Sequence, residues 1–203
     1  MLNELRHTVG EALAAAGFTA MEVVAPRNDL IPVIVAWCVT LLRPEDGRRD
    51  VILGHDKPGL TSALNTTWGR LARESGLLAE AERGGGELVV GLDLAADARD
   101  EPEFECQRWV RVSVRDSWDI AGAGCESGVL GAGRNNPSFV MSSLDGRVLM
   151  AAGYWQVGVG FAVLADPGRV AALRGYARRL ASLPSVEAAQ RDWAQGWARN
   201  VGP

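Results

Sequence analysis

The longest apolar stretch of the chain runs from Phe139 to Asp166, and it constrains the fold more than any other feature. The stretch is rich in residues that favour β-strands, and Leu144-Asp145-Gly146 divides it. An Asp-Gly pair between two such runs is typical of a turn that joins two strands. The stretch therefore predicts the central strands of a sheet, which the rest of the chain must cover.

The other elements follow from the spacing of apolar residues, which is three to four in a helix and two in a strand. Helices are predicted over residues 2–16 before Gly17, after a cap at Thr61 or Ser62, from Pro167 with Asp166 as its cap, and after Pro184-Ser185. Strands are predicted at Phe18–Val24, Leu30–Leu42, Asp50–Leu53, Glu87–Leu94 and Glu103–Arg115. For Leu30–Leu42, the β-branched content and the early Pro32 favour a buried strand over a helix.

The order of these elements predicts one α+β domain over residues 1–203. We expect a mixed or antiparallel sheet covered by the N-terminal helix, the central helix and two C-terminal helices. A chain of 203 residues is long enough to bury a substantial core in this way.

Composition argues against several classes of function. The net charge of −4 lacks the basic footprint of a nucleic-acid binder. Residues 66–77 are only faintly similar to a helix-turn-helix, because the segment that follows is short and acidic. The first residues carry Glu4 and Glu11 in an amphipathic pattern, unlike a signal peptide, and Gly and polar residues interrupt the apolar runs before they reach membrane-span length. We expect a cytoplasmic protein without a membrane partner.

No cofactor or metal is expected either. Three Cys and two His, far apart and without a CxxC pair, do not make a zinc site or a disulfide framework. The loop Gly54–Gly59 lacks the Gly-Lys-Ser/Thr ending of a phosphate loop, because Leu60 follows Gly59. The Gly-rich segment 122–136 does not match the dinucleotide fingerprint.

Cys125 is the most enzyme-like residue of the chain. It lies in the Gly-rich segment, where His55 could activate it from another part of the fold and Asp56 or Asp119 could orient the imidazole. The same residue could equally be an inert thiol, and Glu126 beside it opposes a thiolate. The sequence leaves a cysteine-dependent hydrolase or transferase open as an alternative.

Four tryptophans are candidate contact residues. Trp109 lies on the polar side of an amphipathic strand, and Trp193 and Trp197 stand four residues apart on the last predicted helix. Together with Trp118, they are expected to be exposed anchors of a protein interface, since Trp is enriched at interface hot spots. For Trp109, the alternative is a side chain that lies under a neighbouring loop.

The N-terminal fifth of the chain resembles tail-terminator or tail-completion proteins of long-tailed bacteriophages. The matching pieces are a helix that ends in Leu13-Ala14-Ala15-Ala16-Gly17, a strand at Phe18–Val24, a loop at Pro26–Asp29 and a buried strand at Ile31–Val35. The remaining four fifths depart from that pattern. The resemblance implies a structural protein that forms a ring at the end of a tail tube.

The sequence therefore predicts a non-enzymatic assembly protein that forms a homo-oligomer or joins a larger protein assembly, in the cytoplasm or in a virion. In a ring, subunits would meet through heterologous, head-to-tail contacts. A protein-binding module of the immunity type and the enzyme built on Cys125 and His55 remain the alternatives.

Overall fold

The computed structural model describes residues 2–80, 86–94 and 107–200, and the side chains of these residues except 2–7, 79 and 80. The helices are α1 (Leu2–Ala15), α2 (Val33–Ala36), α3 (Leu60–Glu74), α4 (Ala171–Ala181) and α5 (Ala188–Asn200). The strands are β1 (Phe18–Val24), β2 (Arg49–Leu53), β3 (Ala79–Glu80), β4 (Gly86–Asp93), β5 (Gln107–Val114), β6 (Phe139–Ser142), β7 (Val148–Trp155) and β8 (Gly158–Ala165). Single helical turns are η1 (Trp37–Leu41), η2 (Pro44–Asp46), η3 (Ile120–Gly124) and η4 (Pro167–Arg169).

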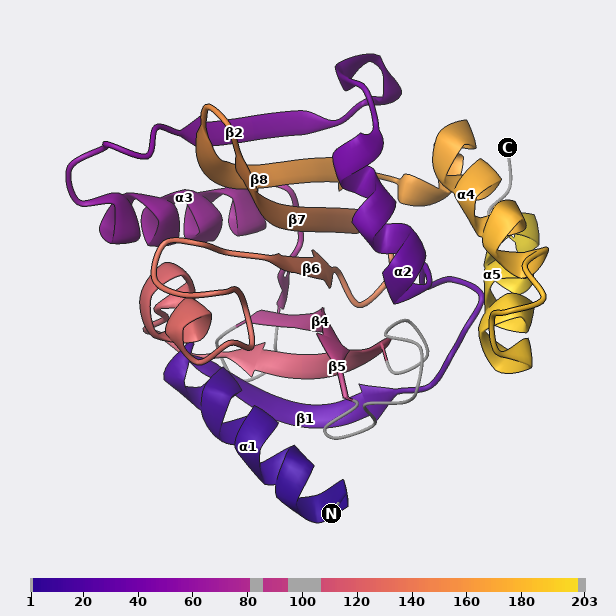
Figure 1. The fold of residues 1–203 in the computed structure, drawn as a ribbon, viewed down its shortest axis with the longest axis horizontal. Helices are drawn as coiled ribbons and strands as arrows, with labels where there is room; N and C mark the ends of the chain where they lie inside the picture. Colours follow the sequence, from indigo (N-terminus) through magenta and orange to yellow (C-terminus); the bar gives the residue numbers. More distant parts are fainter. Residues whose placement is uncertain (1, 81–85, 95–106, 201–203) are drawn as a thin grey trace.

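All strands join one antiparallel sheet, which confirms the predicted α+β class. The order along the sheet is β1-β5-β4-β6-β7-β8-β2, and the short β3 pairs with β4 beside this path. Figure 1 shows the strands stacked from β2 at the top to β1 at the bottom. The two outer strands, β1 and β2, come from the part of the chain up to Leu53, whereas later segments form the centre of the sheet.

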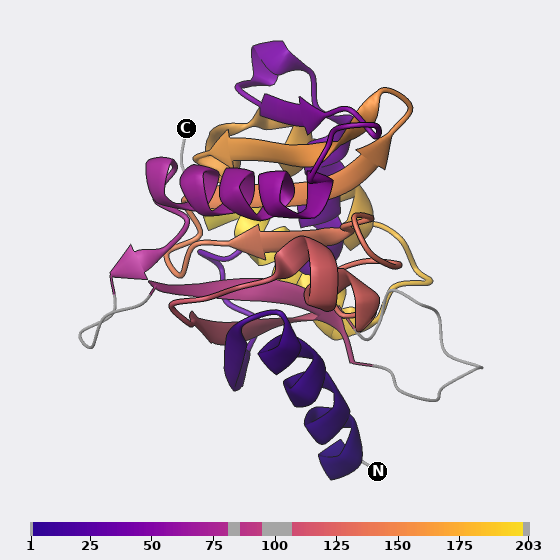
Figure 2. The ribbon, with the colours of Figure 1, turned by 90° about the vertical axis from the view of Figure 1, so that its left-hand side faces the viewer.

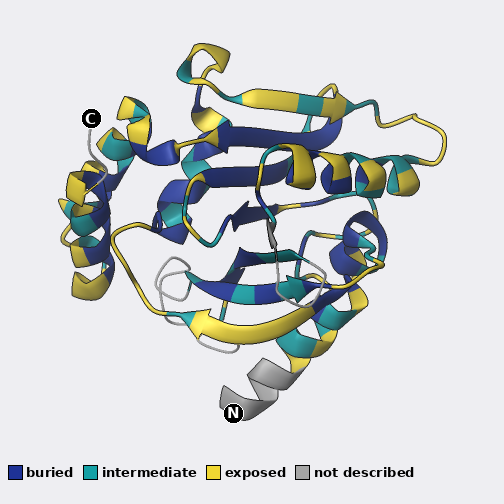
Figure 3. Ribbon diagram, turned by 180° about the vertical axis from the view of Figure 1, so that it is seen from behind, coloured by how far each residue is buried: buried dark blue, intermediate teal, exposed yellow. Residues whose placement is uncertain are grey.

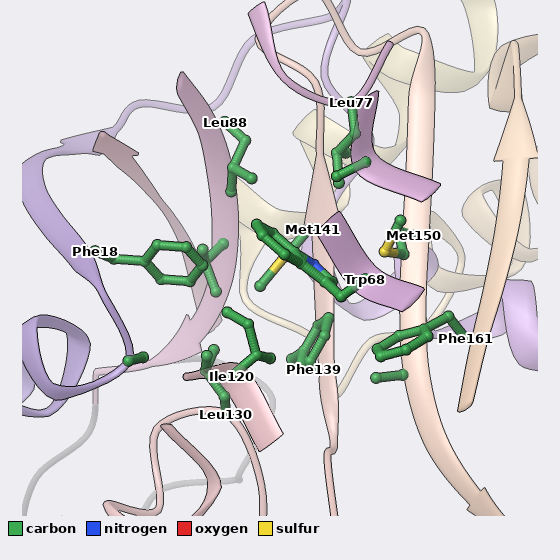
Figure 4. Packing of buried hydrophobic residues seen from close by; sticks show 14 of the residues in the cluster. Phe18, Trp68, Leu77, Leu88, Ile120, Leu130, Phe139, Met141, Met150 and Phe161 are labelled. Carbon is green, nitrogen blue, oxygen red and sulfur yellow. The ribbon is translucent and has the colours of Figure 1, made fainter. Parts of the chain in front are cut away.

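Each face of the sheet carries its own hydrophobic core. On one face α1 and α3 pack against the strands, with Trp68 of α3 among Phe139, Met141 and Phe161 of the sheet (Figures 2 and 4). The other face packs against α2, η1, α4 and α5 in a second cluster. These helices lie behind the sheet in Figure 2. We call the two sides the α1/α3 face and the α4/α5 face.

The central stretch forms β6, β7 and β8. The predicted turn joins β6 to β7, where the Ser143 hydroxyl donates a 2.6 Å hydrogen bond to Asp145 and accepts the Val148 N–H. A second tight turn, Gln156-Val157, joins β7 to β8. This second hairpin was not predicted, because its turn lacks an Asp-Gly or Asn-Gly signal.

The prediction of a strand at Leu30–Leu42 is wrong. The segment forms α2 and η1, and Pro32 stands at the position before the first helical residue, where its ring does not disturb the helix. Its side chains are apolar on nearly every side because they lie between the sheet and the C-terminal helices. Apolar content alone does not distinguish a buried helix from a buried strand, so the β-branched residues misled the prediction.

Two predicted helix caps are also wrong. The helix α3 starts after Gly59, whose backbone is left-handed, and the Thr61 hydroxyl instead donates to the side chain of Asn135 at 2.7 Å. Asp166 has a left-handed backbone (φ 46°) and no capping hydrogen bond, and α4 begins five residues later at Ala171. The buried stripe of α4, with Leu173, Ala177 and Leu180, lies where the spacing predicted it.

Other predicted boundaries need smaller changes. The strand β5 begins at Gln107, and residues 103–106 of the predicted strand lie outside the described part of the chain. In the described residues, no helix is both long enough and apolar enough to cross a bilayer.

Two glycines of β8 allow β2 to approach closely. A methyl group at Gly160 would collide with the backbone carbonyl of Val51, and one at Gly158 would collide with that of Leu53. The carbonyl groups of Val51 and Leu53 therefore point toward β8, the strand with which β2 pairs.

Candidate functional site

The Gly-rich segment is organised by the carboxylate of Asp119. One oxygen accepts the Gly122 N–H (2.9 Å) and the Asn65 side-chain amide (2.7 Å), and the other accepts the Ala123 N–H (2.9 Å). Burial raises the pKa of Asp119, but the hydrogen bonds from Ala123, Asn65 and Gly122 outweigh it, so the pKa lies below its usual value. Asp119 therefore stabilises the turn η3 and is not placed to orient an imidazole.

Cys125 follows this turn and is fully buried. Its thiol donates to the carbonyl oxygens of Ile120 (3.1 Å) and Leu130 (3.6 Å). Burial and the nearby charge of Asp119 raise the pKa of Cys125 to about 12. A thiol with such a pKa carries almost no thiolate at neutral pH, so it is a poor nucleophile.

His55 makes its contacts elsewhere. Its Nε2 lies 3.0 Å from the carbonyl oxygen of Trp155, and its ring stacks on Tyr154 with centroids 4.2 Å apart. No hydrogen bond between described residues joins His55 to Cys125, and Asp56 beside it is exposed to solvent. The contact that a Cys–His nucleophile requires is therefore not formed in this structure.

Three of the four candidate tryptophans are buried, which corrects the expectation that they are exposed anchors. Trp109 and Trp197 are almost fully buried, and Trp193 is 4% exposed. Trp109 donates a 2.6 Å hydrogen bond to the carbonyl of Ile31, so it lies under a neighbouring segment, as the alternative interpretation held. Trp118 is half-buried. Its ring centroid lies 5.5 Å from that of Trp68, and the Cζ atom of Arg73 lies 5.2 Å from the Trp118 ring centroid.

The exposed large apolar side chains of the described residues include three on the edge strands, Met21 and Val23 on β1 and Ile52 on β2. Figure 3 shows β1 and β2 largely exposed, while the inner strands are buried. The most exposed large apolar residues are Val157 (74%), Leu41 (65%), Tyr154 (61%), Met21 (51%), Val23 (42%), Leu183 (39%) and Ile52 (38%). The sequence-based prediction missed Ile52, Tyr154 and Val157. Alternation along a strand does not show which side is exposed, and the turn that joins β7 to β8 lacks a hairpin signal.

Three of these residues lie toward the β2 border of the sheet, on different faces of it. Ile52 belongs to β2, while Tyr154 and Val157 belong to the hairpin of β7 and β8, with which β2 pairs. The stacked ring of His55 connects the end of β2 to Tyr154. We call His55, Tyr154 and Val157 the edge patch. Tyr154 shares a face of the sheet with Val159 and Leu53, whereas Ile52 points to the opposite face.

Hollows in the described part of the molecule include the following two. One, of about 320 Å³, lies between α1, β4 and the Gly-rich segment. The other, of about 440 Å³, is open and lined by Thr61, Ser62, Asn65, Thr66 and Trp118. Cys125 and His55 line neither of these two hollows.

The described residues also offer no group of three or more His, Cys, Asp or Glu side chains that could hold a metal ion. After α3, the chain enters β3 instead of a second helix, so the faint helix-turn-helix pattern is not realised there. No family model matches the chain, and neither a curated protein nor a solved structure resembles it at a significant level. Function must therefore be argued from the surface and the chemistry of this chain.

Proposed function

We propose that this protein is a non-enzymatic assembly protein that binds other protein chains, including copies of itself, at a border of its sheet. The observation that carries the proposal is the edge patch, where Tyr154 is 61% and Val157 is 74% exposed and the ring of His55, which follows the edge strand β2, stacks on Tyr154. Exposed aromatic and apolar side chains are typical of protein interaction sites.

The chemistry of the candidate nucleophile supports a non-enzymatic role. Cys125 is buried with a raised pKa, and Asp119 is occupied by the hydrogen bonds of η3. His55 contributes to the edge patch through its ring. The ionisable groups that the sequence singled out thus stabilise the fold or its surface.

The most concrete form of the proposal is a tail terminator or tail-completion protein in a virion, assembled in the cytoplasm. The support is the N-terminal resemblance, because the helix up to Ala15 and the strand Phe18–Val24 are formed. Residues 31–35 depart from it, since they enter α2 where the resemblance implies a strand. Copies in such an assembly would bury the exposed borders of the sheet against one another.

The mass of the native protein in solution tests this proposal. We expect light scattering on a sizing column to give a multiple of 21.7 kDa at micromolar to submillimolar concentration. Replacing Val157 with Lys should weaken association without lowering the unfolding midpoint, because the side chain is mostly exposed. Electron microscopy of the assembled fraction would reveal a ring if the tail interpretation holds. A strictly monomeric mass, with no partner retained from the native source, would contradict the proposal.

The rate of alkylation tests the enzymatic alternative. In a Cys38→Ser, Cys106→Ser background, Cys125 should react slowly at pH 7, equally in the presence and absence of His55→Ala. The reason is that burial and Asp119 disfavour the thiolate. A reaction midpoint below the ordinary thiol pKa of about 8.5, lost in His55→Ala, would instead support the cysteine-dependent hydrolase or transferase.

A further inference from the structure

The two borders of the sheet differ in how well they are protected from pairing with another strand. The strand β1 contains a bulge between Ala20 and Glu22, and Glu22 forms an ion pair with Arg111 at 3.2 Å. Bulges and charges are common devices that keep an edge strand from pairing with another chain. The strand β2 has an unbroken register with β8, and after Asp50 it continues as the apolar run Val51-Ile52-Leu53.

The outward backbone groups of β2 belong to Ile52. The carbonyl groups of Val51 and Leu53 point toward β8, and successive carbonyls of a strand point in opposite directions. The N–H and C=O of Ile52 therefore face away from the sheet, and its side chain is 38% exposed. Within the described residues, β2 is the last strand of the order, so no further strand covers these groups.

The direction of the strands decides which second strand fits best. Seven strands alternate in direction along the path from β1 to β2, so the two edge strands run the same way. Joining β2 of one copy to β1 of the next, with the sheet continued, would make a parallel pair. Joining β2 to β2 about a twofold axis makes an antiparallel pair, like every other pair in this sheet, and antiparallel pairs are slightly more stable per residue.

We propose that two copies of this chain associate through β2 about a twofold axis at Ile52, forming a sheet that is continuous across both copies. This inference rests on the proposed function, because it specifies how the chain assembles. In this register, Ile52 lies opposite its counterpart and the two residues exchange both backbone hydrogen bonds. Val51 lies opposite Leu53, and the two Asp50 carboxylates stay at opposite ends of the pair.

Other twofold registers of β2 are less favourable. Side chains opposite each other must lie on the same face of the sheet, so the axis must pass through a residue. An axis at Asp50 would place two carboxylates face to face, which is destabilising. An axis at Val51 would place Asp50 opposite Ile52 and Arg49 opposite Leu53, so that charged side chains meet apolar ones.

Cysteine crosslinking tests the register. In a hydrogen-bonded antiparallel pair the opposite Cα atoms are about 5.5 Å apart, within the range of about 4.4–6.8 Å that a disulfide spans. With Cys38 and Cys106 replaced by Ser, Ile52→Cys should form a disulfide-linked dimer under mild oxidation. Val23→Cys on β1 is the matched control, because Val23 is similarly exposed (42%), and it should stay uncrosslinked.

A charge substitution tests the contact without oxidation. Ile52→Lys should abolish the dimer at concentrations where the unmodified protein has twice the mass of one 21.7 kDa chain, while Val23→Lys should leave it intact. If Ile52→Lys folds and still assembles fully, or if Val23→Cys crosslinks in place of Ile52→Cys, this inference is overturned and the proposed assembly function stands. If the unmodified protein is monomeric throughout, both are overturned.

Discussion

The buried polar contacts compared on the two faces of the sheet differ in kind, although Trp118 on the α1/α3 face also donates to the carbonyl of Asn65 at 3.4 Å. On the α1/α3 face a carboxylate accepts, since Asp119 binds two backbone N–H groups and the amide of Asn65. On the α4/α5 face indoles donate, since Trp109 and Trp193 bond to backbone carbonyls within residues 27–31. A carboxylate titrates in acid and an indole does not. The Asp119 contacts of the α1/α3 face should therefore weaken at low pH, whereas the indole contacts of the α4/α5 face should not.

Another buried tryptophan, Trp68, differs from Trp109 and Trp193 in its polar contacts. Trp68 is fully buried on the α1/α3 face, but its indole N–H has no hydrogen-bond partner there. Its neighbours are rings, with Phe18 at 5.9 Å and Trp118 at 5.5 Å. Trp68 therefore contributes packing alone, whereas Trp109 and Trp193 also hold a segment in place.

The largest expected effect is that of Trp193→Ala. Loss of a buried Trp side chain should cost about 3–5 kcal/mol in the free energy of unfolding. It should also release residues 27–31, because Trp193 donates to the carbonyls of Arg27 (2.9 Å) and Leu30 (2.8 Å). Urea unfolding measures the first effect, and the rate of tryptic cleavage after Arg27 measures the second. An unchanged cleavage rate would show that the indole does not hold this segment.

A matched pair of substitutions sharpens the comparison of the two faces. Trp109→Phe and Trp68→Phe remove the same atoms from buried sites, but only the first leaves a carbonyl, that of Ile31, without its donor. An unsatisfied buried group costs about 1–3 kcal/mol, so Trp109→Phe should be more destabilising by that amount. Equal unfolding free energies for the two variants would contradict the assigned roles.

Part of the response to acid should come from Asp119 on the α1/α3 face, beside that of Asp145 in the β6–β7 turn, whose pKa is also lowered because burial raises it less than hydrogen bonds lower it. The folded pKa of Asp119 lies below its unfolded value of about 3.9. Its stabilisation is therefore complete above that pH and is lost as the pH falls through the folded pKa. Asp119→Asn keeps one accepting oxygen but replaces the other by an amide nitrogen, so at least one N–H loses its acceptor and the cost should be about 1 kcal/mol at pH 7. Unfolding curves between neutral and strongly acidic pH should show this difference shrinking toward zero, while the cost of Trp109→Phe stays constant.

The smallest expected effect concerns Asp166 on the α4/α5 face, where α4 begins without a side-chain cap. Because the backbone of Asp166 is left-handed and its side chain makes no capping bond, Asp166→Gly should leave stability unchanged or raise it by up to about 1 kcal/mol. A clear loss in the thermal midpoint would show that the carboxylate contributes a bond after all.

Local patterns predicted much of this fold. The bounds of β1 match the predicted Phe18–Val24, and the stripe Leu173, Ala177 and Leu180 is buried on α4. These elements have one buried and one exposed side or clear end signals, so the order of residues carries the information. Most of the segment Leu30–Leu42 carries no such contrast, because the sheet and the C-terminal helices bury its apolar residues up to Val39, and only Leu41 is largely exposed.

The candidate site was harder to predict, because it depends on contacts distant in sequence. Cys125 was identified correctly as a residue to test, but its burial depends on the turn that Asp119 and Asn65 create. Predicting the edge patch requires the knowledge that β2 pairs with β8. In the sequence, this pairing is indicated only by Gly158 and Gly160. Spacing rules do not contain that information, since glycines in a strand also mark bulges and turns.

The position of β2 at the border of the sheet has a consequence for folding. The contact of His55 with Trp155 closes a loop of 100 residues, so β2 must dock late, after the local hairpins have formed. Until then β8 is itself an edge, and its residues Gly158–Leu164 are all buried and uncharged in the finished fold. Such a strand is prone to aggregate when uncovered. Substitutions that loosen β2 should therefore reduce the yield of refolding more than they reduce the stability of the folded protein.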